Sequence, residues 1–214
     1  MTEAVKRQYD NSRRLAQVRA TRLRVTAAAK GLFIENGYPA TTLESVADAA
    51  DVPLPTLYRL FKSKRVLLSA ILDTSFGGDD EPIAFVDRPA VQAALSEPDP
   101  RQMLAAFARI ATALLVRSSA IQLVLASAAH VDTEAADLLA EIRRQRHTGQ
   151  SRIVAALSER GALDPTLAPS EAADFVYLLM SPDTYRTMTA ERGWTEEQFE
   201  KWLAHALVRT LLVP

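Results

Sequence analysis

The chain has 214 residues, of which 48% are apolar and 24% charged, a composition typical of a globular protein with a hydrophobic core. It contains no cysteine, which excludes disulfides, thiolate metal sites and a cysteine nucleophile. No uninterrupted apolar run reaches the roughly 18 residues of a membrane span, and the N-terminus lacks the apolar segment of a signal peptide, so we expect a cytoplasmic protein away from the membrane.

The net charge of −1 conceals a division along the chain. Residues 1–65 contain 12 Lys and Arg against 6 Asp and Glu, whereas residues 66–214 contain 13 against 20. A basic first part on an acidic remainder indicates that the first part meets a polyanion and the remainder does not. The alternative is a chance distribution of charges.

Helical periodicity of apolar residues extends over nearly the whole chain, and alternating strand patterns are absent. In the basic part it predicts helices over three segments: residues 21–36, 42–50 and 54–61. Gly37 is expected to end the first helix, Thr42 to cap the second, and Ser63 to cap a fourth. The sequence GGDDEP at 77–82 then breaks the chain and is the expected hinge before the acidic part.

The acidic part predicts further helices, so the expected fold class is all-α. We expect a short helix from Pro89, a helix from Asp99 that breaks at Ser118 and Ser119, and a long helix over residues 133–160. The last expected helices occupy residues 168–180, 181–193 and 195–212, the final one starting at the capping box TEEQ.

The second and third predicted helices are joined by the very short link DVP at 51–53. Two helices joined by such a turn indicate a helix-turn-helix, whose second helix enters the major groove of DNA. Leu57 and Phe61 would lie on the buried face of that helix. Its two prolines, Pro53 and Pro55, fall where the first N–H groups have no internal partner, so little hydrogen bonding is lost.

Candidate DNA contacts follow from the exposed face of this helix. Leu54 and Pro55 can offer apolar contact to a thymine methyl, while Thr56, Tyr58 and Lys62 can donate to phosphates. Arg59 can donate to a phosphate or read a guanine. The alternatives are that Tyr58 belongs to the core and that Lys62, Lys64 and Arg65 form an ordinary solvated face.

The segment RVTAAAKGLFIENGYPATTLESVADAADVPLPTLYRLFKSKRVLL, residues 24–68, resembles the DNA-binding domain of TetR-family transcriptional regulators. The resemblance implies that Thr42, Thr56, Tyr58 and Lys64 contact the DNA backbone. The sequence departs from the family pattern at Asp51, usually Gly, and at Pro53, usually the capping Ser. Asp tolerates a left-handed turn, whereas Pro53 lacks a capping hydroxyl. The rest of the chain resembles an actinobacterial-type subset of the family.

The resemblance implies three parts: a basic arm at 1–20, a helix-turn-helix domain at 21–66, and a helical ligand-binding and dimerisation domain at 67–214. The arm, which carries Arg13, Arg14 and Arg19, either follows the minor groove or is a disordered tail.

Dimerisation through the last helices would place two reading helices on one palindrome. The resemblance implies a homodimer through helices at about 170–191 and 195–212, whose apolar positions are Phe175, Leu178, Leu179, Trp202, Leu203, Ala206, Leu207 and Leu211. The alternative is that these residues only close the core of one subunit.

A small-molecule effector of unknown identity is the other implied partner, held among the middle helices. The candidate ligand-binding residues are Met103, Phe107, Ile110, Ile121, Leu125, Arg143, His147 and Tyr177. Each has the alternative of being plain core or surface. Gly149, in the middle of the long helix, leaves room for a ligand or another helix.

No catalytic, metal or cofactor site is predicted. His130, His147 and His205 have no metal-ligand spacing, and no phosphate loop or Ser-His-Asp order is visible. The sequence therefore favours a ligand-responsive repressor that binds double-stranded DNA and is not an enzyme. The alternatives are an architectural protein or activator without a ligand, and an all-α enzyme with a vestigial helix-turn-helix.

Overall fold

The computed structural model describes residues 2–79, 81 and 83–213, with side chains from residue 13 onward. The described residues form helices and their connections, with one isolated bridge between Leu163 and Leu212, so the fold is all-α as predicted. The first part, called the head, contains α1 (Thr2–Ala40), α2 (Leu43–Ala49), α3 (Leu54–Phe61) and α4 (Lys64–Gly77). The remainder, called the body, contains η1 (Phe85–Asp87), α5 (Pro89–Ser96), α6 (Pro100–Ala128), α7 (Thr133–Glu159), α8 (Pro169–Leu179), α9 (Pro182–Arg186), η2 (Thr187–Glu191) and α10 (Glu196–Leu211).

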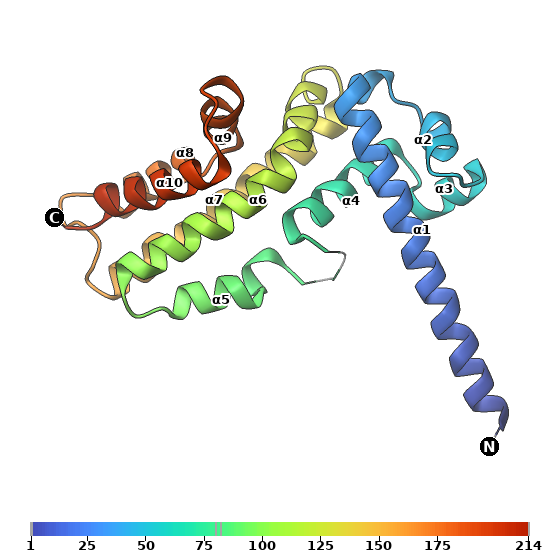
Figure 1. Cartoon of the computed structure of the whole chain (residues 1–214), viewed down its shortest axis with the longest axis horizontal. Coiled ribbons are helices and arrows are strands. Elements are labelled where there is room, and N and C mark those ends of the chain that lie inside the picture. The colour runs from blue at the N-terminus through green and yellow to red at the C-terminus, as the bar shows by residue number, and fades with distance from the viewer. Residues whose placement is uncertain (1, 80, 82, 214) are drawn as a thin grey trace.

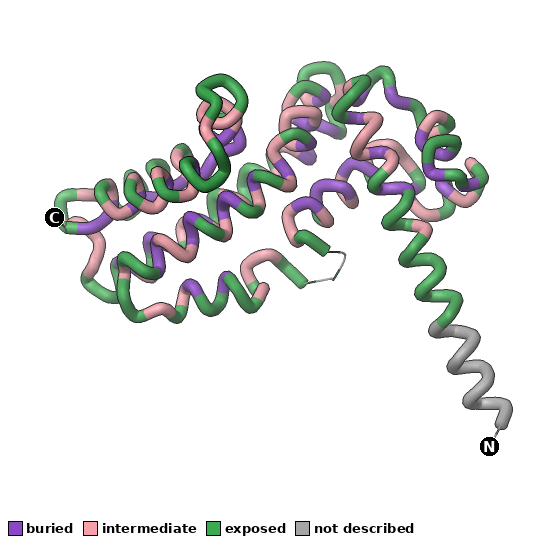
Figure 2. Tube along the Cα trace, in the orientation of Figure 1, coloured by how far each residue is buried: buried purple, intermediate pink, exposed green. Residues whose placement is uncertain are grey.

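Helix α1 is longer than predicted. It begins at Thr2 and not at residue 21, and its first half projects away from the rest of the molecule (Figure 1). Residues 13–20 are exposed, so packing does not explain this extension (Figure 2). Arg, Leu, Ala and Gln dominate the segment and favour helix by propensity. The predicted basic arm is therefore the start of α1; whether it follows the minor groove stays a prediction.

The predicted helix boundaries are confirmed where a capping side chain sets them. Thr42 and Ser45 form a capping box at the start of α2, and Thr195 forms another with Gln198 at α10. Ser63 caps α4 by accepting from the N–H of Val66. Asp99 likewise caps α6.

Two predicted helix boundaries are wrong. Helix α6 runs through Ser118, whose hydroxyl donates to the carbonyl of Leu114 at 2.8 Å and accepts from Gln122 at 2.9 Å. These bonds satisfy the Ser118 hydroxyl within the helix, so Ser118 does not break α6. The segment expected to be one helix over 181–193 is instead the short α9 followed by a π-helical turn, η2.

Apolar side chains gather in two clusters. The body cluster joins α5, the first half of α6, the end of α7, and α8 to α10. The head cluster joins α1 to α4 but also contains Ile121, Leu125 and Ala128 of α6 and Ala135 and Leu138 of α7. The end of α6 and the start of α7 therefore complete the core of the head. The proposed domain boundary at 66/67 stays a prediction.

Helix α6 is the central element and packs against α1, α4, α5, α7, α9 and α10. By length and composition alone, α6 is also long and apolar enough to cross a membrane. Its apolar residues are interrupted by polar ones, so it contains no uninterrupted apolar run of that length. Packing against so many helices is how the core helix of a folded domain behaves.

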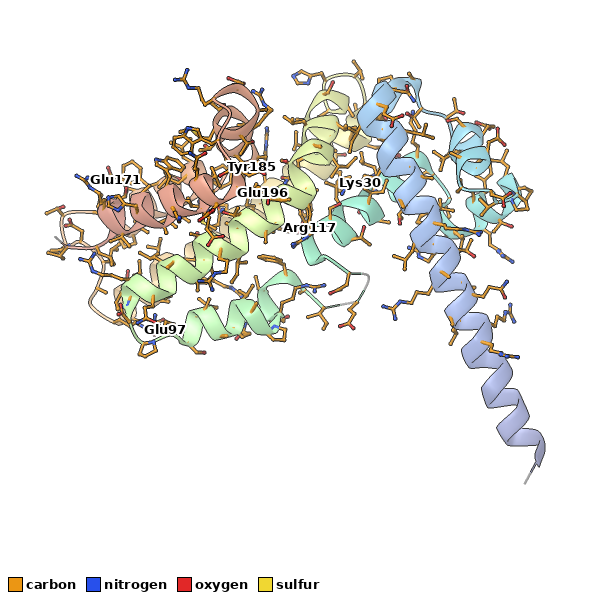
Figure 3. All side chains as sticks on the ribbon, in the orientation of Figure 1. Lys30, Glu97, Arg117, Glu171, Tyr185 and Glu196 are labelled. Atoms are coloured by element: carbon orange, nitrogen blue, oxygen red, sulfur yellow. The ribbon has the colours of Figure 1, made fainter. Side chains whose placement is uncertain are left out.

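A polar junction joins head and body. The ammonium of Lys30 on α1 donates to Ser75 Oγ of α4 at 3.1 Å and to the carbonyl of Arg117 on α6 at 2.7 Å (Figure 3). Arg117 in turn donates to the carbonyls of Ser75 and Phe76. Burial, and secondarily the charge of Arg117, lowers the pKa of Lys30. The junction fixes α4, which leads out of the helix-turn-helix, against the body.

Candidate nucleic-acid interface and ligand cavity

The turn between α2 and α3 is built on a left-handed residue. Asp51 has φ 50°, and the N–H of Val52 returns to the carbonyl of Ala47 at 3.0 Å. This confirms that Asp51 takes the backbone conformation for which glycine is usual. Helix α3 starts directly after Pro53, with no side-chain cap, as the missing hydroxyl at that position predicted.

Helix α3 has one buried and one exposed face. Leu57 and Phe61 are completely buried, whereas Tyr58 is 45% exposed and Arg59 is exposed. Tyr58 is therefore not a core residue. The exposed Lys62 ends the helix with φ 56°. A phenol and two cations thus point away from the core on adjacent turns.

The other predicted DNA contacts surround this face. Thr42 and Pro55 are exposed, and Leu54 and Thr56 are half-buried. Lys64 differs from them because its ammonium is used inside the head: it donates to the carbonyls of Tyr38 and Thr41. Their contact with DNA stays a prediction.

Arg22 is a positioning residue that sequence reasoning missed. Its guanidinium donates to the carbonyl of Leu60 at 3.0 Å and lies 4.6 Å from the centroid of the Phe61 ring. It therefore holds the end of α3 against α1. Arg22 and Leu60 are 38 positions apart in the sequence, which hides this contact from any local pattern.

A cavity of about 1500 Å³ lies between head and body. Its wall includes Leu23 and Thr26 of α1 and Phe76 of α4, together with residues of α6 and α7. Gly149 of α7 also lies on the wall, where a Cβ would be in ordinary contact with Val86 at 3.8 Å. The head thus forms part of the cavity directly.

The predicted ligand-binding residues fall into three groups. Phe107 and Ile110 line the cavity. Met103 lies in the body cluster, and Ile121 and Leu125 lie in the head cluster; all three are completely buried and absent from the cavity wall. Their contact with a ligand stays a prediction. Periodicity could not separate these residues, because core and cavity wall show the same apolar pattern.

The three predicted polar anchors lie together at a shallow separate pocket of about 370 Å³: Arg143, His147 and Tyr177. His147 Nε2 lies 3.8 Å from Asp174, and the His147 and Tyr177 rings are 5.9 Å apart. The three residues therefore lie outside the wall of the large cavity, and their contact with a ligand stays a prediction.

The polar residues that do lie on the cavity wall were not predicted. Arg88 and Arg146 each bury Nε, and Gln150 buries Oε1, with no hydrogen-bond partner among the described residues. Arg146 also lies over the ring of Tyr177, its Cζ 3.8 Å from the centroid. Burial lowers the pKa of the Arg146 guanidinium, which the nearby Tyr177 partly opposes.

Comparison with known proteins gives the same assignment for the head. Residues 25–71 match the family model for bacterial regulatory proteins of the tetR family. The HTH-type transcriptional repressor KstR of Mycobacterium tuberculosis is 41% identical over 76 residues, 36% of this chain and 33% of that protein. The chain spans about a third of the length of the curated relatives it matches. The narrower actinobacterial-type subset stays a prediction.

Solved structures resemble the whole fold. The structure of SmeT with triclosan has a TM-score of 0.71 at 16% identity and covers 91% of this chain and 92% of its own. The transcriptional regulator FadR from Bacillus subtilis, in complex with stearoyl-CoA, has a TM-score of 0.70 at 17% identity. The match covers 88% of this chain and 98% of the FadR chain. At these identities the likeness shows the fold alone.

Proposed function

We propose that the protein is a cytoplasmic transcriptional repressor of the TetR family, which binds a near-palindromic DNA operator as a homodimer and is released by a small, largely apolar ligand. The match of residues 25–71 to the family model and the similarity to KstR support this proposal. The observation that carries this proposal is the two-faced α3. Its core face is anchored by the buried Leu57 and Phe61, and its outer face presents Tyr58, Arg59 and Lys62. Regulation of transcription needs no catalytic residue, so we propose no enzymatic activity.

In the proposed complex, α3 enters the major groove. Arg59 can reach a base edge, while Thr42, Thr56 and Tyr58 donate to phosphates on either side. The phosphate contacts supply most of the affinity and make it fall with rising salt. Leu54 and Pro55 offer apolar contact near the start of the helix.

The proposed dimer uses α8 and α10. Phe175 and Leu178 of α8 are 36% and 62% exposed, an apolar pair that a second copy would cover. Leu203, Leu207 and Leu211 of α10, by contrast, are completely buried inside one subunit, and so belong to its own core. We therefore propose an interface that excludes these three leucines, although the sequence had placed them in it.

Ligand release is supported by the cavity, because α1 and α4 of the head share its wall with α6 and α7. A ligand that binds one head position better than another shifts the population toward it, and thereby changes the spacing of the two reading helices. SmeT and FadR were solved with triclosan and stearoyl-CoA, the second of which has a long apolar acyl chain. An architectural protein or activator without a ligand is the alternative, and a filled interior would have favoured it.

Hydroxyl-radical footprinting of the DNA upstream of the protein's own gene tests the repressor proposal. We expect two protected half-sites whose centres lie about 34–36 Å apart, or a multiple of it, on one face of the duplex. The variant Arg59→Ala should lose the footprint at the same protein concentration. Uniform weak protection without half-sites would contradict a dimer that reads a palindrome.

A further inference from the structure

The cavity wall holds an arginine for which no ion pair at salt-bridge distance is seen among the described side chains. Arg146 lies on α7, buried enough that its Nε has no water-accessible surface and no partner. Its guanidinium lies over the face of the Tyr177 ring, and Tyr177 and the carboxylate of Asp183 both favour its charged form. Two other arginines on the same wall are paired: Arg88 with Asp79 at 2.8 Å, and Arg144 with Glu141. Among the described side chains, no carboxylate forms such a pair with Arg146.

A second unpartnered group lies one helical turn away. Gln150 is 8% exposed, and its Oε1 is buried without a hydrogen bond. Residues four apart on a helix share a face, so Arg146 and Gln150 present a guanidinium and an amide to the same side of α7. Both lie on the cavity wall. Buried polar groups are normally satisfied, and an unsatisfied pair on a cavity wall therefore points to a ligand that satisfies it.

The wall along the first half of α6 is apolar. Phe107, Ile110 and Leu114 follow one another along this helix at intervals of three and four residues. Ile153 of α7 extends the same apolar wall from the far side of Gln150. An occupant must therefore combine a hydrophobic body with a polar group at one place.

We propose that the cavity takes an apolar anion, whose carboxylate or similar oxyanion lies against Arg146 and Gln150 while its hydrophobic body lies along Phe107, Ile110 and Leu114. An oxyanion accepts charge-assisted hydrogen bonds from a guanidinium but cannot donate to Gln150 Oε1. In the proposed complex the Gln150 amide is therefore turned by 180°, so that its N–H takes the place of that oxygen and donates to the oxyanion. It also compensates a cation that burial otherwise penalises. The inference rests on the proposed function, since it names the ligand class of the same cavity.

Displacement of the neutral fluorescent probe N-phenyl-1-naphthylamine from the full-length protein, without DNA, tests this inference. Decanoate and 1-decanol are the competitors, because they share one chain and differ in charge. We expect decanoate to bind at least about tenfold more tightly than decanol, the range of a hydrogen bond to a charged group. Arg146→Gln should remove this preference and leave decanol binding unchanged. Gln150→Leu should reduce the affinity for decanoate more than that for decanol.

The matched control is Arg143→Gln, which removes the same charge from the same helix away from the cavity wall. It should retain the preference for decanoate. Arg146→Gln should stay folded, although it loses the contact of the guanidinium with the Tyr177 ring, and thermal unfolding checks this. Equal affinities of the wild type for the two competitors, or no displacement by either, would overturn the inference. Since the assay contains no DNA, such a result would leave operator binding and the repressor proposal standing, and failure to bind an operator would leave the ligand class standing.

Discussion

The ammonium of Lys64 lies 4.3 Å from the centroid of the Tyr38 ring and donates to the Tyr38 carbonyl at 2.7 Å. It also donates to the carbonyl of Thr41 at 3.1 Å. One cation therefore ties the start of α4 to the end of α1 and to the residue before the cap of α2. Two of its three N–H groups are used in this way, so the head depends on Lys64 for its shape as well as for any contact with phosphate.

Replacing Lys64 with Ala should lower the free energy of unfolding by about 2 kcal/mol, because two carbonyls lose a charged donor. Urea unfolding followed by circular dichroism measures this effect. Lys62→Ala is the control, since Lys62 is exposed and makes no such bonds, and it should stay within about 0.5 kcal/mol of the wild type. Equal losses in the two variants would contradict the structural role of Lys64.

Tyr38 makes stability depend on alkaline pH. Burial, and then the carboxylates of Asp132 and Glu134, raises the pKa of Tyr38 to about 12. Between pH 10 and 12 the unfolded chain ionises this phenol while the folded chain keeps it neutral, so the stability is full below pH 10 and is lost as the pH rises through about 12. Tyr38→Phe should remove a loss of order 1 kcal/mol across this window.

Chemical unfolding at pH 9, 10, 11 and 12 measures the effect of Tyr38 on stability. The exposed Tyr58→Phe variant serves as the control and should follow the wild type at every pH. A wild-type profile that matched that of Tyr38→Phe would contradict the raised pKa.

The exposed face of α3 should separate two kinds of DNA contact. Tyr58→Phe removes a donor to phosphate, so it should weaken binding to operator and non-specific duplexes by the same factor. Lys62→Ala should do the same and reduce the salt slope by about 1. Arg59→Ala should cost about 1–3 kcal/mol on the operator alone if it reads a guanine. Titrations of both duplexes at several salt concentrations distinguish these effects, and a uniform loss for Arg59→Ala would assign it to phosphate.

The apolar pair on α8 should control the oligomeric state. Leu178→Asp places a charge in the proposed interface and should convert the dimer into a monomer, measured by light scattering after size-exclusion chromatography. Val131→Asp is the matched control, because Val131 is 73% exposed on the loop after α6, away from α8. A Leu178→Asp variant with an unchanged mass would contradict the proposed interface.

Local chemistry determined the helix-turn-helix, and so the sequence predicted it well. Helix α3 has the predicted bounds, and Asp51 takes the left-handed conformation. Thr42 caps α2 and Ser63 caps α4, as predicted. Each of these features depends on residues within four positions of one another. The start of α1 was not predicted, because the sequence there lacks the strong apolar periodicity on which the boundary was based.

The cavity could not be predicted, because its wall depends on tertiary packing. Phe107 and Ile110 share their apolar pattern with Met103, yet Phe107 and Ile110 reach the cavity wall and Met103 does not. Arg143 and Arg146 lie on one helix three residues apart, and their different rotation about its axis puts them at different pockets. Ser118 shows the same limit, since the sequence marked it as a helix break, whereas its hydroxyl bonds to Leu114 and Gln122 within the continuous α6.

Sequence-specific binding of DNA is the central claim of this account. Fluorescence anisotropy of the purified protein on its own upstream intergenic DNA, against a scrambled duplex and at two salt concentrations, tests it most directly. The account predicts specific binding at least about 10³-fold tighter than binding to the scrambled duplex. Equal, salt-sensitive binding to both duplexes would contradict a repressor that reads this DNA and would leave the basic head with a sequence-independent role.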